Sequence, residues 1–255
     1  MKGKTLFISG GTRGIGKAIV YAFAQKGCNV AFTYASNEEV ANEIVADVES
    51  KYGIKSHAYK LNILEPETYK DVYKLFDEDF EKLNFFISNA IISGRAVVGG
   101  FGPFMRLKPR GLNNIYTATV DAFVVGAQEA SKRMEKTGGG SIISMSSTGN
   151  LVYTPNYAGH GTNKAAVETM VKYAAAELGE KGIRANAVSG GPIDTDALKA
   201  FPNYEDVKAE VVKRSPLSRM GDAKDLTGAC LFLCSDEASW LTGQTIVVDG
   251  GTSFQ

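Results

Sequence analysis

The sequence predicts an α/β protein with a parallel β-sheet covered by helices on both faces. Apolar runs of strand length alternate with longer segments of helical spacing, and this alternation continues through all 255 residues. A glycine-rich turn follows the first apolar run directly. No repeat, low-complexity tract or Pro/Gly-rich linker divides the chain, so we expect one domain over residues 1–255.

The elements follow one another in a regular order. Seven apolar runs are expected to form the strands, at 5–9, 29–34, 56–61, 84–88, 141–146, 184–189 and 245–249. Helical spacing is found in the segments between them, at 17–26, 38–51, 66–82, 116–136, 163–181 and 222–235. Two stretches, 91–112 and 195–216, break this rhythm. Long excursions after strands usually build the ligand site at the carboxyl edge of the sheet.

Composition excludes several classes of protein. The 28 basic and 28 acidic residues balance, which predicts neither a nucleic-acid partner nor a membrane surface. Three scattered cysteines make no disulfide framework and suit a reducing cytoplasm, and we expect Cys230 and Cys234 to be packed in the core, with no metal site. The first apolar run is too short for a signal peptide, and no segment reaches membrane-spanning length. We therefore expect a cytoplasmic protein.

The turn after the first strand is the sequence SGGTRGIG, from Ser9 to Gly16, and it opens a helix. Glycines let the backbone turn tightly and approach a diphosphate, while the helix N-terminus supplies unpaired N–H groups and a positive dipole. A strand before the motif and a helix after it form the context that a dinucleotide site requires. The sequence therefore predicts a Rossmann-type, doubly wound sheet that binds a nicotinamide cofactor.

The end of the second strand bears on which cofactor is bound. An acidic residue there would bind the 2′-hydroxyl of NAD and repel the 2′-phosphate of NADP. Here the strand ends in TYASN, and the first acid is Glu38, where the next helix is expected to start. Arg13 adds a cation within the glycine turn. We therefore predict NADPH, with Arg13, Ser36 and Asn37 near the phosphate.

The most informative stretch runs from Ser141 to Glu168 and holds two candidate chemistries. Lys164 has His160 four residues before it and Tyr157 seven residues before it. Whichever of these side chains works with the lysine decides which bond a reductase would reduce.

At this point the chain resembles the short-chain dehydrogenase/reductases over essentially its full length. The resemblance rests on the glycine turn, on Ser88-Asn89-Ala90, Ser146-Ser147 and Lys164, and on NAVSGGPIDT (186–195) and TGQTIVVDGG (242–251). The usual catalytic pair of that family is Tyr-x3-Lys, but His160 stands where the tyrosine is expected. The asparagine expected in the fourth long helix is also missing, since YTATVDAF offers only Thr117 or Thr119.

The departures are similar to those of the enoyl-acyl carrier protein reductases, which use Tyr-x6-Lys, the spacing of Tyr157 and Lys164. The third, NADPH-dependent class of these enzymes looks most similar. The resemblance implies catalytic roles for Tyr157 and Lys164, an acyl carrier protein or coenzyme A thioester as substrate, and a homotetramer. It also implies a set of cofactor-binding residues: Gly10, Thr12, Arg13, Gly14, Ile15, Gly16, Ser36, Asn37, Asn62, Ile63, Asn89, Ala90, Lys164, Gly191, Pro192, Ile193 and Thr195.

Tyr-x6-Lys also has a physical rationale. In an enoyl thioester the hydride goes to the β carbon while charge collects on the thioester oxygen, so the acid sits about 3 Å further from the nicotinamide than in a carbonyl reductase. Placing the tyrosine one turn earlier on its helix moves it by roughly 4–5 Å along the axis. The two distances are of the same scale.

Several further residues are candidates for substrate contact. Ser147 stands at the family's catalytic serine position, Tyr153 could line the pocket or donate to the substrate, and Leu198 and Phe201 could line an acyl channel or simply belong to the core. A set of basic residues could steer an acidic carrier protein or coenzyme A toward the site, or could be solvated charges: Arg95, Arg106, Lys108 and Arg110.

Two other functions stay open from the sequence. One is a 3-ketoacyl or broad carbonyl reductase that uses His160 or Tyr157 as its acid. The other is a catalytically silent NADPH-binding protein that acts as a sensor or interaction module. The missing Tyr-x3-Lys argues against the first, and the intact Tyr157 and Lys164 argue against the second.

Overall fold

The computed structural model describes residues 1–92, 97–199 and 204–254. Its centre is a seven-stranded sheet of order β3-β2-β1-β4-β5-β6-β7, in which each strand runs parallel to its neighbours. The predicted doubly wound sheet is thereby confirmed. The strands are β1 (Thr5–Ile8), β2 (Asn29–Tyr34), β3 (Ser56–Lys60), β4 (Phe85–Ser88), β5 (Gly140–Ser147), β6 (Ile183–Gly190) and β7 (Thr245–Val248).

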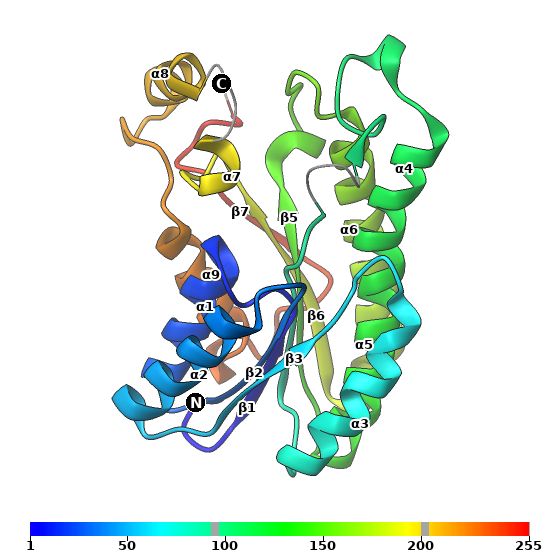
Figure 1. Ribbon diagram of the computed structural model, residues 1–255, viewed down its shortest axis with the longest axis vertical. Coiled ribbons are helices and arrows are strands. Elements are labelled where there is room, and N and C mark those ends of the chain that lie inside the picture. The colour runs from blue at the N-terminus through cyan, green and yellow to red at the C-terminus, as the bar shows by residue number, and fades with distance from the viewer. Residues whose placement is uncertain (93–96, 200–203, 255) are drawn as a thin grey trace.

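Helices cover both faces of this sheet. Figure 1 shows α1, α2 and α9 on one face, and α3, α5 and α6 on the other. The described α-helices are α1 (Gly14–Gln25), α2 (Glu38–Tyr52), α3 (Tyr69–Asp79), α4 (Pro109–Tyr116), α5 (Ala122–Lys136), α6 (Ala158–Leu178), α7 (Asp196–Lys199), α8 (Tyr204–Arg214) and α9 (Thr227–Leu233).

The core is split by the sheet into two halves, as β1 illustrates. Its side chains alternate between the two faces, so Leu6 and Ile8 join the half under α1, while Phe7 joins the half under α3 and α5. Phe7 is fully buried and stacks on Tyr73 of α3 with 4.6 Å between ring centroids. Burying one such aromatic side chain contributes about 2–3 kcal/mol, so an inner strand such as β1 is stabilised by apolar side chains on both of its faces.

Several predicted helix starts differ from the observed ones by a few residues, and two of these differences bear on the site. The helix expected from residue 163 begins at Ala158, because glycines at 159 and 161 let it pack closely on neighbouring backbone. The helix expected from Tyr116 is preceded by α4, which starts at Pro109, where the fixed φ of proline suits a first turn. A π-helical turn, Thr117–Asp121, joins α4 to α5.

The two stretches that break the strand–helix rhythm lie at the same end of the sheet. The 195–216 stretch contains α7 and α8, and the 91–112 stretch leads into α4 (Figure 1). Both extend past the carboxyl ends of the strands, where doubly wound sheets bind their ligands.

Candidate active site

The glycine turn between β1 and α1 has positions that carry no side chain and that could not accommodate one. Gly10 has φ +74° and Gly14 has φ +52°, values in the left-handed region that side chains disfavour. A Cβ at Gly16 would lie 1.9 Å from the carbonyl oxygen of Gly10, so no side chain fits there. The turn and the first N–H groups of α1 can therefore come close to a diphosphate.

Asn89 joins this turn to the end of β4. Its side-chain amide donates to the carbonyl oxygens of Ser9 and Gly10, each at 3.0 Å. In return, the Ser9 hydroxyl accepts hydrogen bonds from the backbone N–H groups of Asn89 and Ala90, each at 3.0 Å. These bonds lock the carboxyl ends of β1 and β4 together at the point where the strand order reverses.

The end of β2 lies beside the turn and carries no carboxylate of its own. Ser36 and Arg13 are exposed, and the Asn37 side chain caps α2 by accepting from the N–H of Val40 at 3.0 Å. Glu38 begins α2, as the sequence predicts. Its carboxylate is hydrogen-bonded to Tyr34, whose pKa is raised by burial and by this partner. The negative charge at this edge is therefore engaged with a tyrosine of β2.

The remaining predicted cofactor residues divide into two groups. Asn62 closes a local turn, accepting from the N–H of Leu64 at 3.1 Å and donating to Glu65 at 2.9 Å, and Ile63 is buried beside it. After β6, the segment from Gly191 to Thr195 reaches the glycine turn. A Cβ at Gly14 would lie 3.8 Å from the γ-methyl of Thr195, so these two loops are in van der Waals reach.

Gly191 itself is constrained by β7. Its N–H donates to Val248 at 3.0 Å, and a Cβ would lie 2.7 Å from the Cα of Asp249. Ile193 is buried, and Pro192 accepts a hydrogen bond from the N–H of Gly221 at 3.3 Å. This segment is therefore held rigidly at the carboxyl edge.

The side chain of Lys164 reaches the carboxyl end of β5. Its side chain comes from α6, only 7 % of the residue is exposed, and Nζ donates to the carbonyl oxygen of Met145 at 2.7 Å. Burial lowers the pKa of Lys164 to about 8, and the Glu168 carboxylate acts in the opposite direction.

Tyr157 meets the same strand end. It is the N-cap residue of α6, with non-helical φ −98° and ψ 4°, and is half-buried. Burial raises the pKa of its phenol, and a hydrogen bond with the Ser147 side chain acts in the opposite direction. The residue before it, Asn156, adopts φ 65°, a left-handed conformation that asparagine tolerates. Ser147 lies two residues after Met145, so Tyr157 and Lys164 converge on one short length of β5.

His160 lies against Tyr157 as a neutral ring. The two rings stack with centroids 5.3 Å apart. Burial, followed by the positive charge of Lys164, lowers the pKa of His160 to about 4. At pH 7 only about one molecule in a thousand therefore holds a protonated imidazole.

The 97–112 stretch is fastened to this site by closely approaching backbones. A Cβ at Gly159 would lie 2.0 Å from the carbonyl oxygen of Gly100, and one at Gly111 would lie 2.2 Å from the nitrogen of Gly100. The contact brings Phe101 edge-on to Tyr157, with 6.4 Å between ring centroids. Phe101 therefore belongs to the wall of the site, although the sequence does not reveal it.

Other predicted substrate residues are placed less centrally. Tyr153 is 87 % exposed, and Leu198 is half-buried on α7. Phe201 and Arg95 lie outside the described residues. Arg106, Lys108 and Arg110 are all exposed, as are their apolar neighbours Phe104 and Met105. Thr117 and Thr119, which stand in place of the expected asparagine, belong to the π-helical turn.

Glu168 was missed by the sequence reasoning. It lies on α6 one turn beyond Lys164, and its carboxylate accepts a hydrogen bond from the hydroxyl of Ser146. The signal was present in the sequence, since residues four apart on a helix share a face. The partner strand, however, could not be identified from spacing alone.

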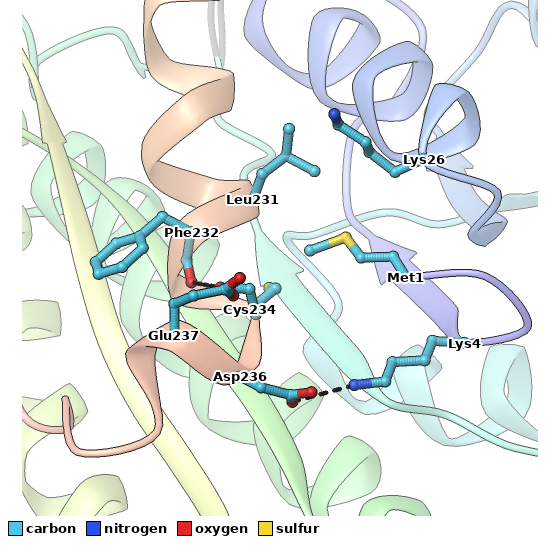
Figure 2. Close-up of a pocket in the computed structure, with 9 residues that line it drawn as sticks. Met1, Lys4, Lys26, Leu231, Phe232, Cys234, Asp236 and Glu237 are labelled. Atoms are coloured by element: carbon cyan, nitrogen blue, oxygen red, sulfur yellow. Dashed lines mark hydrogen bonds and ion pairs between the residues drawn. The ribbon is translucent and has the colours of Figure 1, made fainter.

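Two cavities lie away from this site. One, of about 480 Å³, is bordered by Met1, Lys4 and Lys26 on one side and by the end of α9 on the other, and an ion pair between Lys4 and Asp236 spans it (Figure 2). Lys4 precedes β1, so this cavity is at the amino ends of the strands, opposite the glycine turn. The other, of about 440 Å³, lies between η1 (Pro66–Thr68), the start of α5 and α6.

Cys28, Cys230 and Cys234 are buried free thiols, and burial raises the pKa of Cys230 to about 12. No cluster of three or more His, Cys, Asp or Glu side chains is arranged to hold a metal ion within residues 1–92, 97–199 and 204–254. None of the helices in these same ranges is long and apolar enough to span a membrane.

Comparison with known proteins places the chain in a family. Residues 10–253 match the family described as enoyl-(acyl carrier protein) reductase. The chain is 38 % identical to 1-cyclohexenylcarbonyl-CoA reductase of Streptomyces collinus, covering 97 % of this chain and 86 % of that protein. It is 32 % identical to a 3-oxoacyl-[acyl-carrier-protein] reductase of Staphylococcus aureus, covering 97 % of each.

The structure is similar to that of a 7α-hydroxysteroid dehydrogenase solved with NADH and 7-oxo glycochenodeoxycholic acid. The TM-score is 0.89 at 31 % identity, and the match covers 98 % of this chain and 94 % of the other. Fold, glycine turn and sequence similarity all agree, and the chain belongs to the short-chain dehydrogenase/reductase family of oxidoreductases.

Proposed function

We propose that the protein is an NADPH-dependent enoyl-acyl carrier protein reductase, which reduces the trans-2 double bond of enoyl thioesters during fatty acid elongation. The proposal rests on one observation, which is that the side chains of Tyr157 and Lys164 both form hydrogen bonds at the carboxyl end of β5. His160, at the usual tyrosine position, is neutral at pH 7 and has no readily lost proton. Tyr157 is therefore the better hydrogen-bond donor to a substrate oxygen.

The bare glycine turn fits a dinucleotide, because side chains at Gly10 and Gly16 would collide with its own backbone and with Ala90. NADPH, when bound, supplies a hydride for the β carbon of the thioester. The Tyr157 phenol then donates a hydrogen bond to the thioester oxygen and stabilises the negative charge that collects there. The Lys164 ammonium holds the nicotinamide ribose hydroxyls and favours the charged transition state. The proton for the α carbon comes from Tyr157 or from water.

NADPH is proposed over NADH because of the charges at the end of β2. Arg13 is an exposed cation on the glycine turn, and Ser36 and Asn37 offer polar groups nearby. The Glu38 carboxylate is hydrogen-bonded to Tyr34. A 2′-phosphate at this edge would meet a guanidinium, whose planar group of donors suits phosphate oxygens.

The substrate class is supported by the Streptomyces relative. Its name denotes a coenzyme A thioester whose carbonyl is attached to a ring double bond, which is an enoyl thioester in chemical class. The exposed cations Arg106, Lys108 and Arg110 suit the phosphates of coenzyme A or an acidic carrier protein. Assembly into a homotetramer and a cytoplasmic location remain part of this proposal.

A second candidate is a 3-ketoacyl reductase, favoured by the 32 % identity to the Staphylococcus enzyme. The two functions differ in which carbon receives the hydride, so one assay separates them. NADPH oxidation is followed in parallel with crotonyl-CoA and acetoacetyl-CoA. Oxidation with the enoyl compound alone supports the proposal, and oxidation with the keto compound alone supports the second candidate. Oxidation with neither contradicts both reductase assignments and favours a catalytically silent cofactor-binding protein.

The cofactor is tested in the same assay. Replacing Arg13 by Ala is expected to raise the KM for NADPH by roughly 10- to 150-fold, since a charge-assisted hydrogen bond contributes about 1.5–3 kcal/mol. The KM for NADH is the control and is expected to stay unchanged. Equal effects on both cofactors would show that Arg13 does not read the phosphate.

A further inference from the structure

A polar cluster lies between α6 and the carboxyl end of β5, in which Lys164 is buried and Glu168 and Ser146 are half-buried. Lys164 and Glu168 are one helical turn apart, and both reach the carboxyl end of β5. Lys164 donates to the carbonyl oxygen of Met145, and Glu168 accepts from the hydroxyl of the very next residue, Ser146. Two adjacent side chains of the helix therefore hold two consecutive residues of the strand.

The polar groups of this cluster lie on the α6 side of the sheet. Met145 points into the opposite half of the core, so the alternation of the strand directs Ser146 toward α6. On β6, Ser189 is the register partner of Ser146, and its buried hydroxyl has no partner among the described residues. The Glu168 carboxylate serves as acceptor for the Ser146 hydroxyl, which the apolar core cannot satisfy.

We propose that Glu168 is a positioning residue for Lys164: held by Ser146, it keeps the ammonium aligned and charged at the carboxyl end of β5. This inference rests on the proposed role of Lys164 in holding the cofactor. A buried ammonium pays a desolvation cost that favours its neutral form, and a carboxylate four residues away on the same helix face offsets that cost.

The Glu168 carboxylate is the charge that favours the ammonium form of Lys164, against the burial that disfavours it. Within one turn of Lys164 on α6 the titratable groups are His160 and Glu168, and Tyr157 caps the helix. The other titratable groups of α6, which are Lys172, Tyr173 and Glu177, lie two or more turns beyond Lys164. The charged group of the facing strands β5 and β6 is Arg184, whose guanidinium donates to the carbonyl oxygens of Leu241 and Ser235; the other polar side chains of these strands are uncharged. Asp121, in the π-helical turn, lies in the wall of the separate 440 Å³ cavity.

The experiment measures the Kd of NADPH by fluorescence between pH 6 and pH 10, which does not depend on which substrate is reduced. In the wild-type protein, binding is expected to weaken as Lys164 deprotonates above about pH 8. In Glu168→Gln the weakening is expected roughly one pH unit lower, the order of shift that a neighbouring charge produces. Glu168→Asp retains the charge and is expected to restore most of the wild-type profile.

Glu177→Gln is the matched control, because it removes the same charge from an exposed position on the same helix. A folded Glu168→Gln protein with the wild-type pH profile would overturn the inference. If that variant does not fold, Ser146→Ala decides: a shift in the same direction supports the proposal, and no shift refutes it. If Lys164→Met has the wild-type pH profile of NADPH binding, Lys164 does not hold the cofactor. The proposed role of Lys164 is then wrong, and so is the positioning role of Glu168.

Discussion

Replacing Tyr157 by Phe removes one hydroxyl and leaves the aromatic packing in place. The ring lies over Gly149, where a Cβ would be 2.5 Å from it, and contacts His160 and Phe101 at centroid distances of 5.3 and 6.4 Å. Only the hydrogen bond with Ser147 is lost, which amounts to about 1 kcal/mol. For a chain of this size, the Tm is therefore expected to fall by only about 2–4 °C.

Activity is expected to respond far more strongly than stability. Loss of one oxyanion-stabilising donor lowers kcat by about 10²–10³-fold, equivalent to roughly 3–4 kcal/mol of transition-state stabilisation. The assay is NADPH oxidation with crotonyl-CoA at saturating cofactor, together with a thermal melt of the same preparation. Tyr173→Phe is the matched control, since it makes the same change at an exposed position on the same helix.

The reasoning would be refuted if Tyr157→Phe kept full activity while His160→Phe lost it. In that case the imidazole, not the phenol, would be the group that contacts the substrate oxygen. A large fall in the Tm of Tyr157→Phe would instead show a structural role for the hydroxyl.

Two other perturbations follow from the geometry of the site. Gly159→Ala places a Cβ 2.0 Å from the carbonyl oxygen of Gly100, so the 97–112 stretch must move by about 1 Å. A displacement of that size is expected to lower kcat/KM by roughly 10²-fold. Gly179→Ala is the control and is expected to leave kcat/KM unchanged, because its Cβ meets nothing within 4 Å. His160 has a pKa lowered from 6.5 to about 4, so the unfolded chain binds the extra proton first and stability is lost as pH falls from 6.5 to 4, by at most about 3 kcal/mol. In thermal melts at pH 7, 5 and 4, His160→Gln is expected to remove this loss of stability at low pH. His57→Gln, at the other histidine, is the control and is expected to lose stability as the wild type does. Identical pH profiles of stability for the wild type and His160→Gln would contradict the lowered pKa of His160.

Much of the fold was predictable because its signals are local. Apolar runs and helical spacing are properties of neighbouring residues, and they located the seven strands within a residue or two of their ends. The glycine turn was predictable for the same reason, since a strand, a tight turn and a helix follow one another along the chain. The spacing of Tyr157 and Lys164 was likewise visible directly.

Helix starts near the site were predicted less well. Gly159 and Gly161 do not look like parts of a favourable first turn, because glycine loses more conformational freedom than other residues in a helix. The structure shows that their missing side chains let the helix approach Gly100 and Gly149. Packing with a distant segment therefore outweighed the local preference, and the helix begins at Ala158 rather than at residue 163, which makes Tyr157 its N-cap.

The sequence by itself determined the layered sheet, the position of the dinucleotide turn and the pair of residues offered for catalysis. Only the tertiary structure decided that Phe101 packs edge-on against Tyr157, that Glu168 accepts a hydrogen bond from Ser146, and that His160 is buried enough to stay neutral. The reason is physical: these properties depend on contacts between residues far apart in the chain, and on how much water those contacts exclude. Neither the contacts nor the excluded water can be predicted from the local periodicity of the sequence.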